Sequence, residues 1–100
     1  AEHNGSYTAA FKNIFDWASR HQQKVWSEKP MLLLATSPGG RGGATVLEAA
    51  ASTFPHLGGN VVATFSLPSF YDNFEVGSGV TDADLKSSLE EVVGKLQEAL

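Results

Sequence analysis

Two short segments hold the residues whose types and spacing could do chemistry. The first is SPGGRGG, residues 37–43, which has four glycines, one proline and one arginine directly after an apolar run. A loop with so little side-chain bulk, placed between a strand and a helix, lets backbone amides approach a flat or anionic ligand closely. A tight strand-to-helix turn needs fewer glycines, so the composition favours contact with a ligand or another subunit over a purely geometric role.

The second segment is EHNGS, residues 2–6, which offers free backbone amides and a serine just before a predicted helix. Loops at the carboxyl ends of parallel strands meet at one edge of a sheet, so we expect both segments to lie together there. Glu2, His3, His21 and His56 lack the spacing of metal ligands, so no metal site is expected. A lone loop histidine such as His3 is more often solvated than catalytic.

Neither segment matches a common catalytic or nucleotide-binding motif. No Lys-Ser or Lys-Thr follows the glycines, as a Walker phosphate loop requires, and Thr45 occupies the position of the third glycine in a dinucleotide-binding fingerprint. Because the chain has no G-x-S-x-G elbow, Ser37 is a poor candidate nucleophile. An esterase-like or Walker-type phosphate-binding domain is therefore disfavoured.

The composition of the chain narrows the class of protein. One hundred residues make one small domain, and 42% apolar with 18% charged residues is ordinary for a globular protein. A net charge of −4 with seven scattered basic residues argues against nucleic-acid binding. The absence of cysteine excludes disulfides and fits a reducing compartment. No apolar run approaches the roughly 18 residues of a membrane span, and no signal peptide is visible. We expect a cytoplasmic protein without a nucleic-acid or membrane partner.

Two predicted strands lead into the loops of interest. The apolar run MLLLA, residues 31–35, follows Pro30 and has the pattern of a strand buried on both faces. The segment NVVATFSL, residues 60–67, is a second strand rich in Val, Thr and Phe, and Pro68 ends it.

The first helix is predicted over residues 7–20, with Ser6 as its N-cap. Trp17 falls outside the apolar stripe and is either a half-exposed aromatic residue or a subunit contact, with neither interpretation favoured. Residues 21–29 then form a polar connector that contains Trp26. The stripe consists of Tyr7, Phe11, Ile14, Phe15 and Ala18.

Two more helices are predicted after the glycine-rich loop. One is stopped by Pro55 and then by the glycines at residues 58–59, and the other begins at a capping box formed by Thr81 and Asp84. Residues 69–81, before the last helix, form a long loop of a kind that is often functional or contacts a partner. The two helical stripes are Val46, Leu47, Ala50, Ala51 and Phe54, and then Leu85, Leu89, Val92 and Leu96 with Ala99 or Leu100.

The order helix, strand, helix, strand, helix predicts an α/β fold with a parallel sheet. Two strands make too small a sheet to bury three amphipathic helices. A strand as apolar as residues 31–35 is also expected to have a neighbouring strand on each side. The chain also begins without methionine, in a polar stretch typical of a loop. We therefore expect residues 1–100 to be the C-terminal portion of a single α/β domain whose N-terminal half is absent.

Five short motifs together resemble the NADPH-dependent FMN reductases, flavodoxin-like enzymes that include azoreductases and quinone reductases. The motifs are Glu2-x-Asn4-Gly5-Ser6, Phe11-Lys12-Asn13, Asp16-Trp17, Lys29-Pro30 and Ser37-Pro38-Gly39-Gly40-x-Gly42-Gly43. Their order makes the resemblance specific, and it covers nearly the whole chain but weakens after Leu67. It implies the C-terminal half of a flavodoxin-like three-layer fold with a parallel sheet, from the loop after the third strand through the last helix.

The resemblance also implies a cofactor, a reaction and a site. FMN would be the cofactor and NAD(P)H the electron donor, with hydride passing through the flavin to an acceptor such as flavin, quinone or an azo compound. Residues 2–6 would hold the isoalloxazine ring largely through their backbone, and residues 37–43 would flank the same ring or that of a partner subunit in a homo-oligomer. The implied cofactor-binding residues are Glu2, His3, Asn4, Gly5, Ser6, Ser37, Pro38, Gly39, Gly40, Arg41, Gly42 and Gly43; no catalytic residue is assigned.

Three departures from the family pattern matter for function. Ala1 stands where the family has proline, and His3 stands where it commonly has tyrosine, so flavin stacking or acceptor preference would change. The family's phosphate-binding loop on the first strand is missing, so we expect the isolated 100 residues to bind FMN weakly or not at all and to be inactive. The alternative is a non-enzymatic flavodoxin-like interaction module that has lost its flavin.

Overall fold

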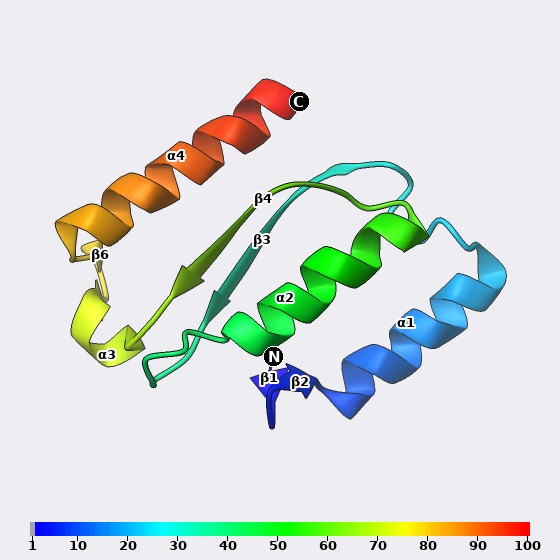
Figure 1. Cartoon of the computed structure of the whole chain (residues 1–100), viewed down its shortest axis with the longest axis horizontal. Coiled ribbons are helices and arrows are strands. Elements are labelled where there is room, and N and C mark those ends of the chain that lie inside the picture. Colours follow the sequence, from blue (N-terminus) through cyan, green and yellow to red (C-terminus); the bar gives the residue numbers. More distant parts are fainter. Residues whose placement is uncertain (1) are drawn as a thin grey trace.

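The computed structural model describes residues 2–100, so the expectation about Ala1 lies outside the described residues. Two long strands, β3 and β4, lie side by side, with α4 on one side of the pair and α2 and α1 on the other (Figure 1). The elements are β1 (Glu2–His3), β2 (Ser6–Tyr7), α1 (Ala9–His21), β3 (Pro30–Thr36), α2 (Ala44–Thr53), the 3-10 helix η1 (Phe54–Leu57), β4 (Asn60–Leu67), α3 (Phe70–Asn73), β5 (Phe74–Glu75), β6 (Gly79–Val80) and α4 (Ala83–Ala99).

The central pair is parallel, as predicted. The register joins Met31 to Val61 and Leu32 to Ala63, so β4 carries one extra residue at this point. Helix α2 and η1 connect the end of β3 to the start of β4, which makes a strand–helix–strand unit. The glycine-rich loop and the end of β4 therefore lie at the same edge of the sheet.

The first helix begins later than predicted because its preceding residues form a hairpin. Glu2 pairs with Tyr7 and His3 with Ser6, around a two-residue turn in which Asn4 and Gly5 have φ of 53° and 77°. An Asn-Gly turn between two extended residues is a strong hairpin signal. Ser6 is therefore extended, and the predicted Ser6 cap was wrong. Thr8 is the N-cap instead, since its hydroxyl accepts from the Phe11 amide at 3.0 Å.

The interpretation of residues 69–81 as a loop without structure was wrong. This stretch forms α3 and then a small antiparallel hairpin in which Phe74 pairs with Val80. The predicted capping box was also displaced by one residue: the Asp82 carboxylate accepts from the Leu85 amide at 2.9 Å and caps α4. Thr81 does not cap the helix. Its amide donates to the Asn73 carbonyl, and this hydrogen bond closes the hairpin.

The second α-helix ends at Thr53, two residues before Pro55, as expected for a helix that precedes a proline. The chain continues past Thr53 as η1, with Pro55 in the first turn, where its missing N–H is not needed. Gly58, with φ of 83°, then ends the turn, and its amide donates to the carbonyls of Phe54 and Pro55. Pro55 thus follows the end of the α-helix and Gly58 ends the 3-10 turn, so both predicted stop signals are observed.

An aromatic cluster between α1 and η1 forms the centre of the core. Phe15 and Phe54 are buried, with ring centroids 5.7 Å apart, and Trp26 packs on Phe54 at 4.8 Å. The connector interpreted as polar therefore contributes a core residue. Because the side of α1 that bears Phe15 faces this cluster, Ile14 points away and is 70% exposed, so its place in the predicted stripe was wrong. Trp17 is 72% exposed.

Strand β3 is less buried than its composition predicted. Its residues are half-buried or exposed, and Leu34 is 59% exposed. The cause is that β3 has β4 on one side and no described strand on the other. Within residues 2–100, no helix is long and apolar enough to cross a membrane.

Candidate functional site

The two loops singled out in the sequence meet in one pocket of about 410 Å³. Glu2 and Gly5 come from the hairpin turn region, and the glycine-rich loop and the start of α2 supply the remaining lining residues. These are Ser37, Gly39, Gly40, Arg41, Gly43 and Thr45. The expected juxtaposition of the two loops is therefore observed. Thr45 was missed as a site residue, although its place in the first turn after the loop was a usable signal.

Contacts across this pocket are close. A methyl group in place of the Gly5 hydrogen would lie 3.7 Å from Thr45 Cγ2, so the hairpin turn lies directly over the first turn of α2. The Arg41 guanidinium donates to Thr45 Oγ1, which folds the arginine back along the same turn. The remaining expected residues, His3, Asn4, Ser6, Pro38 and Gly42, are not brought into the pocket wall.

The four glycines of the loop fall into two pairs. Gly42 and Gly43 have φ of 61° and 73°, and a Cβ on them would come within 2.9 Å of the Pro68 nitrogen and 3.0 Å of Ala35 Cβ, respectively. These two glycines are required by the turn itself. Gly39 and Gly40 have neither a positive φ nor any atom within 4 Å of such a Cβ. Their lack of a side chain leaves open space at the pocket instead.

The glycine-rich loop is held in place from β4 and the residues that follow it. The Ser66 hydroxyl donates to the Gly42 carbonyl at 2.9 Å. The amides of Ser69 and Phe70 donate to the carbonyls of Gly39 and Ser37 at 2.9 and 3.0 Å. Sequence reasoning missed these supports, because they join segments that are distant in the sequence and carry no motif. These three hydrogen bonds hold the loop against the end of β4 and the residues that follow it.

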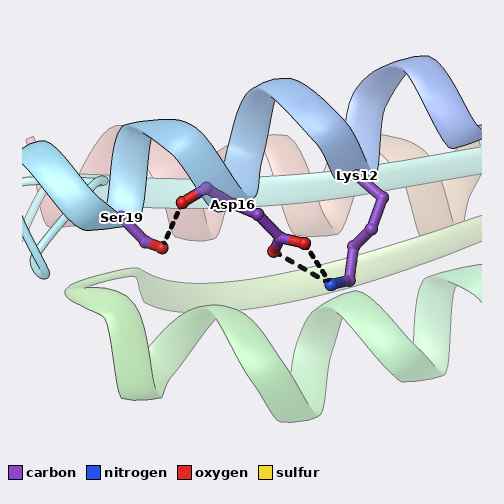
Figure 2. Close-up of polar contacts among 3 residues, drawn as sticks. All are labelled: Lys12, Asp16 and Ser19. Carbon is purple, nitrogen blue, oxygen red and sulfur yellow. Dashed lines mark hydrogen bonds and ion pairs between the residues drawn. The ribbon is translucent and has the colours of Figure 1, made fainter.

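The motif residues on α1 do not contribute to the pocket. Figure 2 shows the Lys12 ammonium donating to both carboxylate oxygens of Asp16 at 2.9 and 2.8 Å, and the Ser19 hydroxyl donating to the Asp16 carbonyl at 2.7 Å. Lys12 and Asp16 are more than half exposed, so this pair stabilises the helix by only about 0.3–0.5 kcal/mol. Lys12, Asp16 and Ser19 therefore interact with one another on the exposed surface of α1.

The lining chemistry determines what the pocket can hold. Half of its lining residues are glycines, with Arg41 as the cation and Glu2 as the carboxylate among the described lining residues. The ion pairs recorded among the described residues lie elsewhere, so neither charge is neutralised by a partner there. Two open glycines beside a cation leave room for a flat ligand that carries polar atoms. Within residues 2–100, no three His, Asp or Glu side chains are placed to hold a metal ion.

Comparison with known proteins identifies the class. A family model described as NADPH-dependent FMN reductase matches residues 1–72, which include both loops, β3, β4 and the α2 region between them. The parallel pair with helices on both sides is therefore a partial flavodoxin-like α/β fold, as predicted. The chain belongs to the NADPH-dependent FMN reductase family. Comparisons with curated proteins and with solved structures gave no significant match.

Proposed function

We propose that this chain provides one wall of the flavin site of an NAD(P)H-dependent FMN reductase. The reaction would pass hydride from the nicotinamide to FMN and on to an acceptor such as flavin, a quinone or an azo compound. The observation that carries this proposal is the meeting of residues 2–6 and 37–43, the two family motifs, around one pocket of about 410 Å³. Bound FMN supplies the redox chemistry, and the protein binds and orients it.

Each part of the pocket has a distinct proposed role. Gly39 and Gly40 leave the backbone bare, so the flat face or edge of the ring can lie against it. Arg41, held by Thr45, places a positive charge beside the ring. Ser66 is a positioning residue, because it holds the loop from behind. His3 is exposed on the hairpin. It stands where the family commonly has tyrosine, so this position would change flavin stacking or acceptor preference.

We further propose that residues 1–100 act as the C-terminal portion of one flavodoxin-like domain. The unpaired outer side of β3 supports this, since further parallel strands would fit there. The cation in the pocket, Arg41, lies beside the proposed ring position, so the FMN phosphate would be bound by the other half of the domain. By family likeness, the assembled enzyme would be a cytoplasmic homo-oligomer.

A chimera tests this proposal. The N-terminal half of an FMN reductase of this family is joined to Glu2, and flavin absorbance and NADPH oxidation are measured. We expect the chimera to purify with FMN and to oxidise NADPH, and the isolated chain to show no saturable FMN binding in the micromolar range. Micromolar binding of FMN by the isolated chain would contradict the proposal that the other half of the domain binds the FMN phosphate. A folded chimera without flavin would support the alternative, a non-enzymatic interaction module.

Matched variants of the chimera locate the ring. Gly39→Val and Gly40→Val each place a side chain in open space, so the fold should persist. The affinity for FMN should fall more than about tenfold, because the added side chain keeps the ring away from the loop backbone. Gly94→Val in α4 is the control: a Cβ there also meets nothing within 4 Å, and the residue is outside the pocket. Equal FMN affinity in all three variants would show that the ring lies elsewhere.

A further inference from the structure

Residues 69–81, which lie between β4 and α4, make polar contacts that lead back to the glycine-rich loop. They comprise α3 and the β5–β6 hairpin, and α3 lies at the same end of the sheet as the loop that precedes α2 (Figure 1). The proposed function places the further strands of the domain beyond β3, whereas this segment follows β4. Its contacts with the loop are made within this chain, so they need no residue from the other half of the domain.

The peptide unit between Pro68 and Ser69 is hydrogen-bonded at both of its ends. Its carbonyl, on Pro68, accepts from the Asn73 side-chain amide at 2.9 Å. Its N–H, on Ser69, donates to the Gly39 carbonyl at 2.9 Å. The carbonyl and the N–H of a trans peptide unit point in opposite directions. The Asn73 side chain therefore fixes, from the far end, the orientation of the unit that holds Gly39.

The same geometry carries the effect into the pocket. Because the Gly39 carbonyl points toward Ser69, the Gly40 amide in the same peptide unit points away from it. Gly39 and Gly40 line the pocket and residues 68–73 do not, so this direction is the pocket side of the loop. Within residues 2–100, the Gly40 amide donates to no backbone carbonyl. It is thus available to an acceptor atom of a bound ligand.

Ser69 needs support from other residues to keep this arrangement. Its φ of 47° and ψ of 60° lie in the left-handed region, which is costly for a residue with a Cβ and persists only where neighbouring contacts hold it. The Ser69 side chain makes no capping hydrogen bond to α3. Asn73 binds the peptide units on both sides of the Ser69 α-carbon, since its backbone amide also donates to the Ser69 carbonyl at 3.2 Å. The conformation of Ser69 therefore depends on Asn73.

We propose that Asn73 is a positioning residue of the flavin pocket. Its side chain fixes the Pro68–Ser69 peptide unit, which holds the Gly39 carbonyl out of the pocket and turns the Gly40 amide into it. This role rests on the proposed function for the identity of the ligand, FMN. Asn73 lies just beyond residues 1–72, which the family model matches, and outside the pocket wall, so it acts through the loop.

Amide hydrogen exchange of the 100-residue chain, followed by NMR, tests the support without flavin. Asn73→Asp keeps the size of the side chain and removes its N–H donor, and Asn73→Ala removes the whole amide group. In each variant we expect the Ser69 amide to exchange about fivefold faster or more, the change that corresponds to one hydrogen bond of ordinary net strength. Asn60→Asp, at the exposed start of β4, is the matched control and should leave this rate unchanged. Unchanged exchange at Ser69 in both Asn73 variants would overturn the proposal.

The chimera with the N-terminal half of a family member measures the effect on the flavin site. With either Asn73 substitution, the affinity for FMN should fall about fivefold or more, because the Gly40 amide loses its fixed direction. At saturating FMN, the absorption spectrum of the bound flavin should also shift, since its hydrogen bonding changes. A merely less stable fold would reduce the amount of bound flavin without shifting its spectrum. Asn60→Asp should alter neither quantity.

The two measurements separate the role of Asn73 from the proposed function. An unsubstituted chimera that binds no FMN would contradict the proposed function, and hydrogen exchange would then decide whether Asn73 holds the loop. A chimera that binds FMN with the same affinity and the same spectrum in all variants would overturn the role of Asn73 in the flavin pocket.

Discussion

At the scale of single residues, the glycine-rich loop combines two requirements in one motif. Gly42 and Gly43 allow the chain to pass closely over β3 and the end of β4, and Gly39 and Gly40 keep the pocket side bare. The sequence alone predicted that four glycines exceed the needs of a turn. It could not assign the two roles, because the roles depend on where β4 and Pro68 lie.

This division predicts opposite outcomes for two similar substitutions. Gly42→Ala should destabilise the chain by about 1–3 kcal/mol, because a Cβ would crowd the Pro68 nitrogen at 2.9 Å while φ is positive. Gly39→Ala should change stability by less than about 0.5 kcal/mol, since the space is open. Thermal unfolding followed by circular dichroism measures both. Equal destabilisation by the two variants would contradict the assignment.

At the scale of elements, the two long strands were predicted well, whereas the two short hairpins were missed and the caps of the first and last helices were misplaced. Residues 60–67 match β4, because a β-rich run ending in proline is a local signal. Ser6 and Thr81 were wrongly chosen as caps, because each lies in or beside a hairpin whose pairing involves residues further along the chain. Trp26 was placed in a polar connector for a similar reason: its burial depends on Phe54, far away in sequence.

The corrected cap gives a direct test of the start of α1. Thr8→Ala should cost about 1 kcal/mol, because it removes the acceptor for the Phe11 amide. Ser6→Ala is the matched control and should be nearly neutral, since the Ser6 side chain is exposed and caps nothing. Urea unfolding at equilibrium gives both free energies of unfolding. A larger loss of unfolding free energy for Ser6→Ala than for Thr8→Ala would support Ser6 as the N-cap.

At the scale of the whole molecule, the family motifs predicted the location of the candidate site better than they predicted its lining. The meeting of residues 2–6 with residues 37–43 was expected from loops that gather at the carboxyl edge of a parallel sheet, and Glu2 and Gly5 do lie at that edge beside the glycine-rich loop. Thr45, and the support from Ser66, required the three-dimensional arrangement. The burial of β3 was overestimated, because a composition suited to a central strand occurs here at an edge.

The buried Tyr7 hydroxyl makes no hydrogen bond within the described residues, and Tyr7 lines the same cavity as residues 32–36 of β3. If the other half of the domain covers this side of β3, the folded state is stabilised by mass action, and the melting temperature should rise as that half is added. Tyr7→Phe should reduce the rise, because it removes the group that the other half would satisfy. Differential scanning calorimetry at several concentrations of the N-terminal half measures the rise for both proteins; a melting temperature independent of that concentration in the unsubstituted chain would contradict the coupling. Thermal stability would then be a property of the solution as well as of the sequence.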